Sequence, residues 1–100
     1  MGIKTHKDLD VLKLSIQLVK DIYQLSSKFF SEEKFGLVAQ IRRAVVSIPS
    51  NISEGAARNS DKDYIRFLYI SLGSLSEIET QLIIAEELGF SVLIQAGVIR

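Results

Sequence analysis

The spacing of apolar residues in residues 37–55 constrains the fold more than any other feature of this chain. The segment reads LVAQIRRAVVSIPSNISEG. Its apolar side chains recur every three or four positions, which is the spacing of one face of an α-helix. The row consists of Leu37, Ile41, Ala44, Val45, Ile48 and Ile52. We therefore expect a helix that buries this row in a core.

A second row in the same segment is polar and keeps the same spacing. It consists of Gln40, Arg43, Ser47, Ser50 or Asn51, and Glu54. One interpretation is that the short side chains bond to their own helix near Pro49. Another is that Arg43 and Glu54 form salt bridges with Glu77 and other charges of the third helix. A third is that the row faces a partner subunit or a ligand.

Pro49 lies inside this helix and removes one backbone donor, so a kink is expected there. The alternative is a break into two helices, since Asn51 and Glu54 have capping-box spacing. A kinked single helix is favoured, because the apolar row passes through the proline without losing phase. This helix is expected to end at about residue 57.

The first helix is predicted to begin at a cap from Asp8 and to end near residue 28. Its apolar row predicts the buried face: Val11, Leu14, Leu18, Ile22, Leu25 and Phe29. A connection over residues 29–36 follows, in which Ser31 offers the N-cap of the second helix.

The third helix is the longest and is expected over residues 61 to about 88. Ser60 and Asp63 have capping-box spacing, and Gly89 is a C-terminal stop. Gly73 and Ser74 lie mid-helix, where small side chains let another backbone approach closely. The predicted core row is Tyr64, Leu68, Leu72, Leu75, Ile78, Leu82 and Ala85, with Phe67 and Ile83 beside it.

Three long helices joined by short turns predict an all-α protein, an antiparallel up-down helical bundle in one domain over residues 1–100. Residues 88–99 read LGFSVLIQAGVI and carry no charge. Twelve residues are too few to span a bilayer, so this stretch is either a short closing helix or an exposed end.

Composition excludes several classes of function. The chain contains no cysteine and one histidine, His6, so disulfides and thiolate or histidine-rich metal sites are excluded. The N-terminal residues lack the apolar run of a signal peptide, and a cytoplasmic protein is expected. We expect no cofactor, no membrane attachment and no small-molecule substrate.

Catalysis is not expected either. The serines of the polar row have no histidine base in reach, because His6 belongs to another element. Glu77 and Glu79 point to different helix faces, and no acidic pair has a companion that would complete a metal site. No glycine-rich phosphate loop follows a strand.

The basic residues leave nucleic-acid binding open. Twelve basic and twelve acidic residues give no net charge, which is not typical of a globally basic binder. Phosphate contacts become possible if four basic residues share a surface, namely Arg42, Arg58, Lys62 and Arg66. Asp61 and Asp63 dilute such a patch, and the alternative is that these charges are solvated or paired. Arg42 and Arg43 diverge by about 100° on a helix, so both cannot fully face one partner.

Several strings of this sequence match those of a known family. They are QIRRA at residues 40–44, SIPSNI at residues 47–52, and Glu54-Gly55 with Arg58. Shorter matches are Leu9-Asp10-Val11, Phe35-Gly36-Leu37, Phe67-Leu68-Tyr69-Ile70, Gly73-Ser74 and Glu77. Together they cover residues 8 to about 90. The chain resembles the small bacterial four-helix-bundle proteins encoded in intervening sequences of 23S ribosomal RNA, to which accessory proteins of diversity-generating retroelements are related.

The resemblance implies a four-helix protomer that assembles with itself into a ring, typically a homopentamer. It also implies nucleic-acid association, through basic surface residues, for at least the retroelement branch. Arg42, Arg43, Ser47, Asn51 and Glu54 carry over as fold and assembly residues, and Gly73 joins the assembly set.

The chain departs from the family pattern at two places. Phe30 stands where the family usually has proline, which leaves the first loop less constrained. The family's fourth helix should be amphipathic and charged and should continue well past residue 100. Here the closing stretch SVLIQAGVIR is short, so a short or truncated fourth helix is expected.

The sequence therefore predicts a non-catalytic, self-associating helical bundle that serves as an accessory or scaffold protein and associates with RNA or DNA. The alternative is a protein–protein interaction module without a nucleic-acid role, whose polar row docks a protein partner or a sister subunit.

Overall fold

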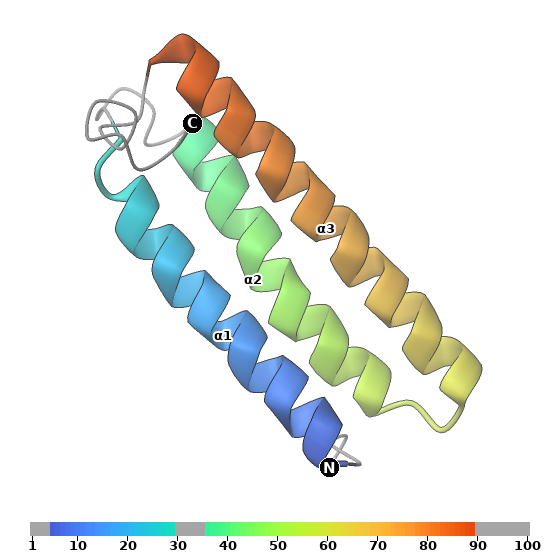
Figure 1. Ribbon diagram of the computed structural model, residues 1–100. Coiled ribbons are helices and arrows are strands. Elements are labelled where there is room, and N and C mark those ends of the chain that lie inside the picture. The colour runs from blue at the N-terminus through green and yellow to red at the C-terminus, as the bar shows by residue number, and fades with distance from the viewer. Residues whose placement is uncertain (1–4, 30–35, 90–100) are drawn as a thin grey trace.

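The computed structural model describes residues 5–29 and 36–89, which form three helices (Figure 1). They are α1 (His6–Ser26), α2 (Leu37–Ala56) and α3 (Asp61–Leu88). No strand occurs in these residues, so the predicted all-α class is confirmed. The expectations for Phe30, for the Ser31 cap and for a fourth helix fall on residues 30–35 and 90–100, outside the described part.

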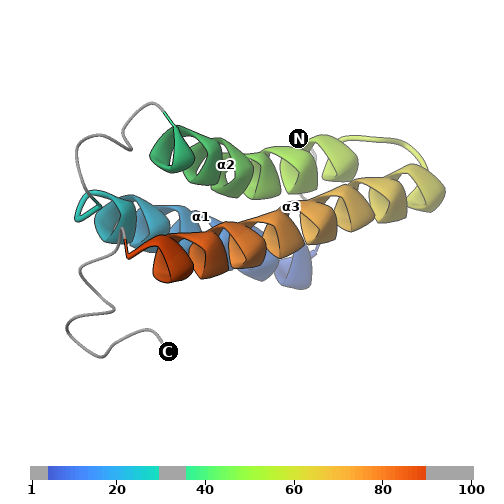
Figure 2. The same ribbon diagram turned by 90° about the horizontal axis from the view of Figure 1, so that it is seen from above.

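The central element of the fold is α2. Both α1 and α3 pack against it and make few contacts with each other. Consecutive helices run antiparallel, so α1 and α3 run parallel on the two sides of α2 (Figure 1). Viewed at right angles, α2 is displaced to one side of the other two helices (Figure 2). The three helices therefore form a bundle with an open side between α1 and α3.

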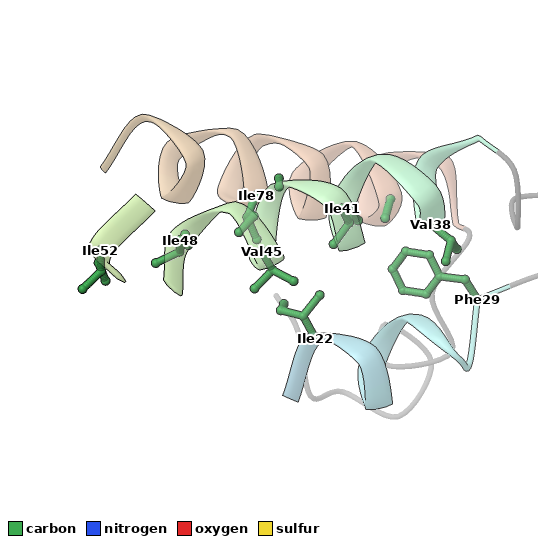
Figure 3. Close-up of a cluster of buried hydrophobic side chains, with 10 residues drawn as sticks. Ile22, Phe29, Val38, Ile41, Val45, Ile48, Ile52 and Ile78 are labelled. Carbon is green, nitrogen blue, oxygen red and sulfur yellow. The ribbon is translucent and has the colours of Figure 1, made fainter. Parts of the chain in front are cut away.

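The apolar row of α2 fills the core, as its spacing predicts. Ile41 and Val45 have no exposed surface, and their neighbours along the row are buried. Ile22 of α1 and Ile78 of α3 approach this row near Val45, and Phe29 covers its end near Val38 (Figure 3). One helix face thus holds both of the other helices by burial of apolar surface.

The helix ends confirm part of the predicted capping. The Ser60 hydroxyl accepts from the Asp63 backbone N–H at 3.1 Å, and Gly89 ends α3 with φ 69°, in the left-handed region that favours glycine. The Asp8 cap is wrong. Thr5 caps α1, its Oγ1 accepting from the Asp8 N–H at 3.1 Å, so Asp8 lies inside the first turn.

Pro49 does not divide α2. The helix runs without interruption from residue 37 to residue 56, so the favoured single helix is confirmed and the alternative of two helices is wrong. Its N-cap is Gly36, which has no side chain with which to cap the helix.

The predicted core rows of α1 and α3 are wrong in part. Leu14 is 71% exposed and Leu72 is 57% exposed, and Val11, Leu75 and Ile83 are also exposed. The residues that α3 buries are Phe67, Ser71, Ile78, Gln81 and Ala85. Apolar residues lie on more than one face of α1 and of α3. Their spacing alone therefore did not show which face packs against α2.

Polar contacts help to set the rotation of α3. The Ser71 hydroxyl donates to the Ile48 carbonyl oxygen at 3.2 Å, and the hydroxyls of Ser47 and Ser74 lie 2.6 Å apart. The buried Gln81 amide donates to Glu77 at 3.0 Å, while its Oε1 has no partner among the described residues. Short polar side chains therefore occupy part of the α2–α3 interface.

Gly55 permits the close approach of α2 and α3. A Cβ added at Gly55 would lie 2.6 Å from the Phe67 Cβ and 3.1 Å from the Tyr64 Cδ1. A Cβ added at Gly73 would meet nothing within 4 Å among the described residues. The small residue that the packing of α2 against α3 requires is therefore Gly55 and not Gly73.

These two glycines give a matched pair of substitutions. Gly55→Ala is expected to destabilise the fold by about 1–3 kcal/mol, because the methyl group overlaps the Phe67 side chain. Gly73→Ala is expected to stabilise it by up to about 1 kcal/mol, since alanine favours a helix interior over glycine. Urea denaturation of both variants measures the difference. Equal effects would contradict the assignment of the tight contact to Gly55.

Candidate nucleic-acid interface

Three of the four predicted phosphate-binding residues lie together at the end of the bundle where α2 leads into α3. Arg58 follows α2, and Lys62 and Arg66 lie one turn apart on α3. The guanidinium carbons of Arg58 and Arg66 lie 5.1 Å and 4.6 Å from the centre of the Phe67 ring. All three basic side chains are exposed. We call Arg58, Lys62 and Arg66 the basic cluster.

Phe67 orients the two arginines of the basic cluster. Its side chain is 7% exposed, so the ring is held in the core and the guanidinium groups rest against it. Cation–π attraction favours this arrangement and restricts the two exposed arginine side chains. Gly55 makes it possible, because its missing side chain lets Phe67 lie against the end of α2.

Acidic residues surround the basic cluster and limit its field. Glu54 Oε2 lies 3.9 Å from Arg58 Nη2, an exposed pair of the kind that contributes little stability. Asp61 and Asp63 lie in the first turn of α3, where they complement the helix dipole. Together, Glu54, Asp61 and Asp63 balance the three positive charges of the basic cluster.

A hydrogen bond links α1 to α3 at the end of the bundle that carries the basic cluster. The Tyr64 hydroxyl donates to Asp8 Oδ1 at 2.6 Å. Partial burial, followed by the hydrogen bond and the negative charge of Asp8, raises the pKa of Tyr64 from 10.0 to about 12. The phenol therefore stays protonated and remains a donor throughout the neutral range.

Arg42 does not lie with the basic cluster. Its Nε donates to the Ser26 hydroxyl at 2.9 Å, and its Nη2 donates to the Tyr23 carbonyl oxygen at 3.1 Å. The guanidinium also lies 4.5 Å from the centre of the Tyr23 ring. Sixteen residues separate Arg42 from Arg58, which is about 24 Å along a helix. The four basic residues do not form one surface, and Arg42 holds α1 against α2.

The polar row of α2 bonds mainly to its own helix. Ser47 donates to the Ala44 carbonyl, Ser50 to the Val46 carbonyl, and the Asn51 amide to the Ser47 carbonyl. These bonds fit the first interpretation of the row, with the contact between Ser47 and Ser74 in addition.

The predicted salt bridges between the polar row and α3 are wrong. Glu54 pairs with Arg58 after its own helix, and Glu77 accepts from Gln81. Arg43 is exposed, and within residues 5–29 and 36–89 its side chain makes no ion pair. The side-chain amide of Gln81 donates to Glu77. The sequence analysis did not identify Gln81 as a partner of Glu77.

The described residues contain neither a membrane-spanning helix nor a cluster of metal ligands. None of the three helices combines the length and hydropathy needed to cross a membrane. Nor does any group of three or more histidine, cysteine, aspartate or glutamate side chains there have a placement that could hold a metal ion.

Comparison with known families identifies the chain's relatives. A sequence model described as 23S rRNA-intervening sequence protein matches residues 7–95, which include all three helices except the first residue of α1. The chain belongs to this family. No curated relative matches it. The matched region contains the basic cluster, Gly55 and the whole polar row of α2.

The two adjacent arginines of α2 test the structural role of Arg42. Arg42→Ala removes two hydrogen bonds to α1 and the contact with the Tyr23 ring, and we expect it to cost about 2 kcal/mol of unfolding free energy. Arg43→Ala removes the same charge without such contacts inside the protomer and, at a dilution where the chain is monomeric, should stay within about 0.5 kcal/mol of the parent. Chemical denaturation followed by circular dichroism compares the two, and equal losses would exclude this role.

Proposed function

We propose that this protein is a non-catalytic, self-associating accessory or scaffold protein that associates with RNA or DNA. The observation that carries the proposal is the basic cluster, which gathers Arg58, Lys62 and Arg66 at one end of the bundle. Three cations on one exposed surface can contact consecutive phosphates of a nucleic-acid strand.

The chemistry of the cluster favours phosphate over base recognition. The Phe67 ring is buried beneath the guanidinium groups and offers no open face on which a base could stack. The guanidinium N–H groups and the Lys62 ammonium are donors suited to phosphate oxygens. Binding is therefore proposed to be independent of sequence and sensitive to salt.

Self-association would compensate for the small size of the basic cluster. One protomer carries three clustered basic residues and no net charge, so the affinity of a single protomer for nucleic acid would be modest. A homo-oligomer, a pentamer in the form that the family resemblance implies, presents several clusters to one strand and gains affinity through multivalency. We also propose that the protomer has four helices, of which residues after Gly89 form the fourth. The protein is proposed to act in the cytoplasm.

A protein–protein interaction module without a nucleic-acid role is the second candidate. The acids around the basic cluster favour it, as do the exposed apolar side chains of α1 and α3. In this case Arg43, Glu54 and Gly73, which lie on the surface of α2 and α3, would contact a sister subunit or a protein partner.

Nucleic-acid binding is tested with a fluorescent single-stranded RNA and a duplex DNA at low salt, followed by anisotropy. The triple variant Arg58→Gln, Lys62→Gln, Arg66→Gln should lose at least about tenfold in affinity and show a shallower salt dependence. The control is Lys13→Gln, Lys20→Gln, Lys28→Gln, which removes the same charge from exposed positions of α1 and its end. Absence of binding, or equal losses in both variants, would remove this function.

Self-association is tested by light scattering on the purified chain and on the variants Arg43→Ala and Glu54→Ala. If these side chains contact a sister subunit, each variant changes the particle mass while circular dichroism reports unchanged helicity. An unchanged mass for both would count against the assembly role, whatever the outcome with RNA.

A further inference from the structure

Tyr69 exposes an aromatic ring on the surface of α3. Its side chain is 68% exposed. Within residues 5–29 and 36–89 it makes no hydrogen bond and no cation–π contact. Each of the other aromatic side chains in these residues is buried or contacts a charged residue; they are Tyr23, Phe29, Tyr64 and Phe67. In this part of the chain, Tyr69 is therefore the aromatic ring that is open to a ligand.

The ring of Tyr69 lies on the side of α3 that faces away from the core. Tyr69 precedes the buried Ile78 by nine residues, and at 3.6 residues per turn nine residues end half a turn out of phase. Helix α3 forms one edge of the bundle, so this side faces solvent (Figure 1). A fourth helix on the open side between α1 and α3 would pack against other residues of α3, namely Leu68, Ser71, Leu72 and Leu75.

Tyr69 extends the surface of the basic cluster along α3. Residues three, four and seven positions apart share one face of a helix, and Arg66 and Lys62 lie three and seven residues before Tyr69. The helical rise places them about 4.5 Å and about 10 Å from Tyr69 along the axis. About three nucleotides of one strand span that length, at about 3.4 Å each. Phosphates at the basic cluster and a base at Tyr69 can therefore belong to one short stretch of a strand.

No acidic residue lies beside Tyr69 on α3. Its neighbours on the helix surface are the residues three, four and seven positions away in either direction. Two of these neighbours are basic and none is acidic; they are Lys62, Ile65, Arg66, Leu72, Gly73 and Ser76. A nucleic-acid strand that crosses Tyr69 therefore meets no negative charge from these positions.

Gly73 leaves space on the C-terminal side of the ring. Helical side chains lean toward the N-terminus, so a side chain at residue 73 would cover the surface one turn earlier, beside Tyr69. Gly73 has no side chain, and a Cβ built there would meet nothing within 4 Å among the described residues. The ring is thus accessible from this side, while the basic cluster lies on its N-terminal side.

We propose that Tyr69 is a stacking platform for an unpaired base and that the nucleic acid bound by this protein is single-stranded. This inference rests on the proposed association with RNA or DNA through the basic cluster. An unpaired base can lie face to face with the ring, whereas a base inside a duplex has both faces covered by its neighbours. Every base has such a face, so stacking on Tyr69 keeps the binding independent of sequence.

The test compares three labelled probes of equal length by fluorescence anisotropy: oligothymidine, the same strand without its bases, and a DNA duplex. The parent chain should bind oligothymidine at least about fivefold more tightly than the abasic strand. Tyr69→Ala should lose this preference and bind the abasic strand and the duplex within about twofold of the parent. Tyr69→Phe is the matched control and should keep the preference, because it keeps the ring. Tyr69→Leu keeps an apolar side chain without a ring and should lose it.

A fluorescent variant reports the stacking itself. The chain contains no tryptophan, so Tyr69→Trp introduces a single indole at this position. Oligothymidine should quench its emission, because an unpaired base lies on the ring. The abasic strand and the duplex should leave the emission unchanged.

Three outcomes would overturn this inference alone. They are equal affinities of the parent for oligothymidine and the abasic strand, equal affinities of the parent and Tyr69→Ala for oligothymidine, and a changed particle mass of Tyr69→Ala, which would place the ring in a contact between subunits. Salt-dependent binding of the duplex that requires the basic cluster would then leave the proposed function standing. No binding of any probe would overturn both. Circular dichroism of Tyr69→Ala excludes loss of the fold as the cause.

Discussion

The burial of one face of α2 determines the rest of this structure. Because α1 and α3 make few contacts with each other, the position of each is set by its contact with the row that contains Ile41 and Val45. Directed contacts then adjust the two flanking helices separately. Arg42 bonds to the end of α1, while Ser47 and the Ile48 carbonyl bond to serines of α3. Apolar burial supplies the attraction, and these polar contacts supply part of the register.

The sequence predicted the helices well because their signals are local. The rhythm of α2, the Ser60 cap and the Gly89 stop are each encoded within a few residues. The errors arose where the answer depends on another helix. Threonine and aspartate are both common N-cap residue types, but Thr5 caps α1 while the Asp8 carboxylate accepts from the Tyr64 hydroxyl. Likewise, the contacts of Ser71 and Ser74 help to set the rotation of α3, and serines do not belong to an apolar row.

The basic residues of the candidate interface could be predicted from the sequence, but the aromatic ring that they lie against could not. Arg58, Lys62 and Arg66 are close in sequence, and a short turn keeps them close in space. The ring of Phe67 beneath two of them depends on contact across helices, for which Gly55 was the available signal. Arg42 has the same charge but a structural role, because a carbonyl and a hydroxyl of α1 lie within hydrogen-bonding distance of its guanidinium group.

The four-residue connection between α2 and α3 has a consequence for how the protein folds. A short link makes the contacts of these two helices local, so little loop-closure entropy is lost when they pair as a hairpin. Pairing of α1 with α2 requires closure of the longer segment from Ser27 to Gly36. The hairpin is thus the natural cooperative unit, and α1 is the helix that can detach by sub-global opening while α2 and α3 stay paired.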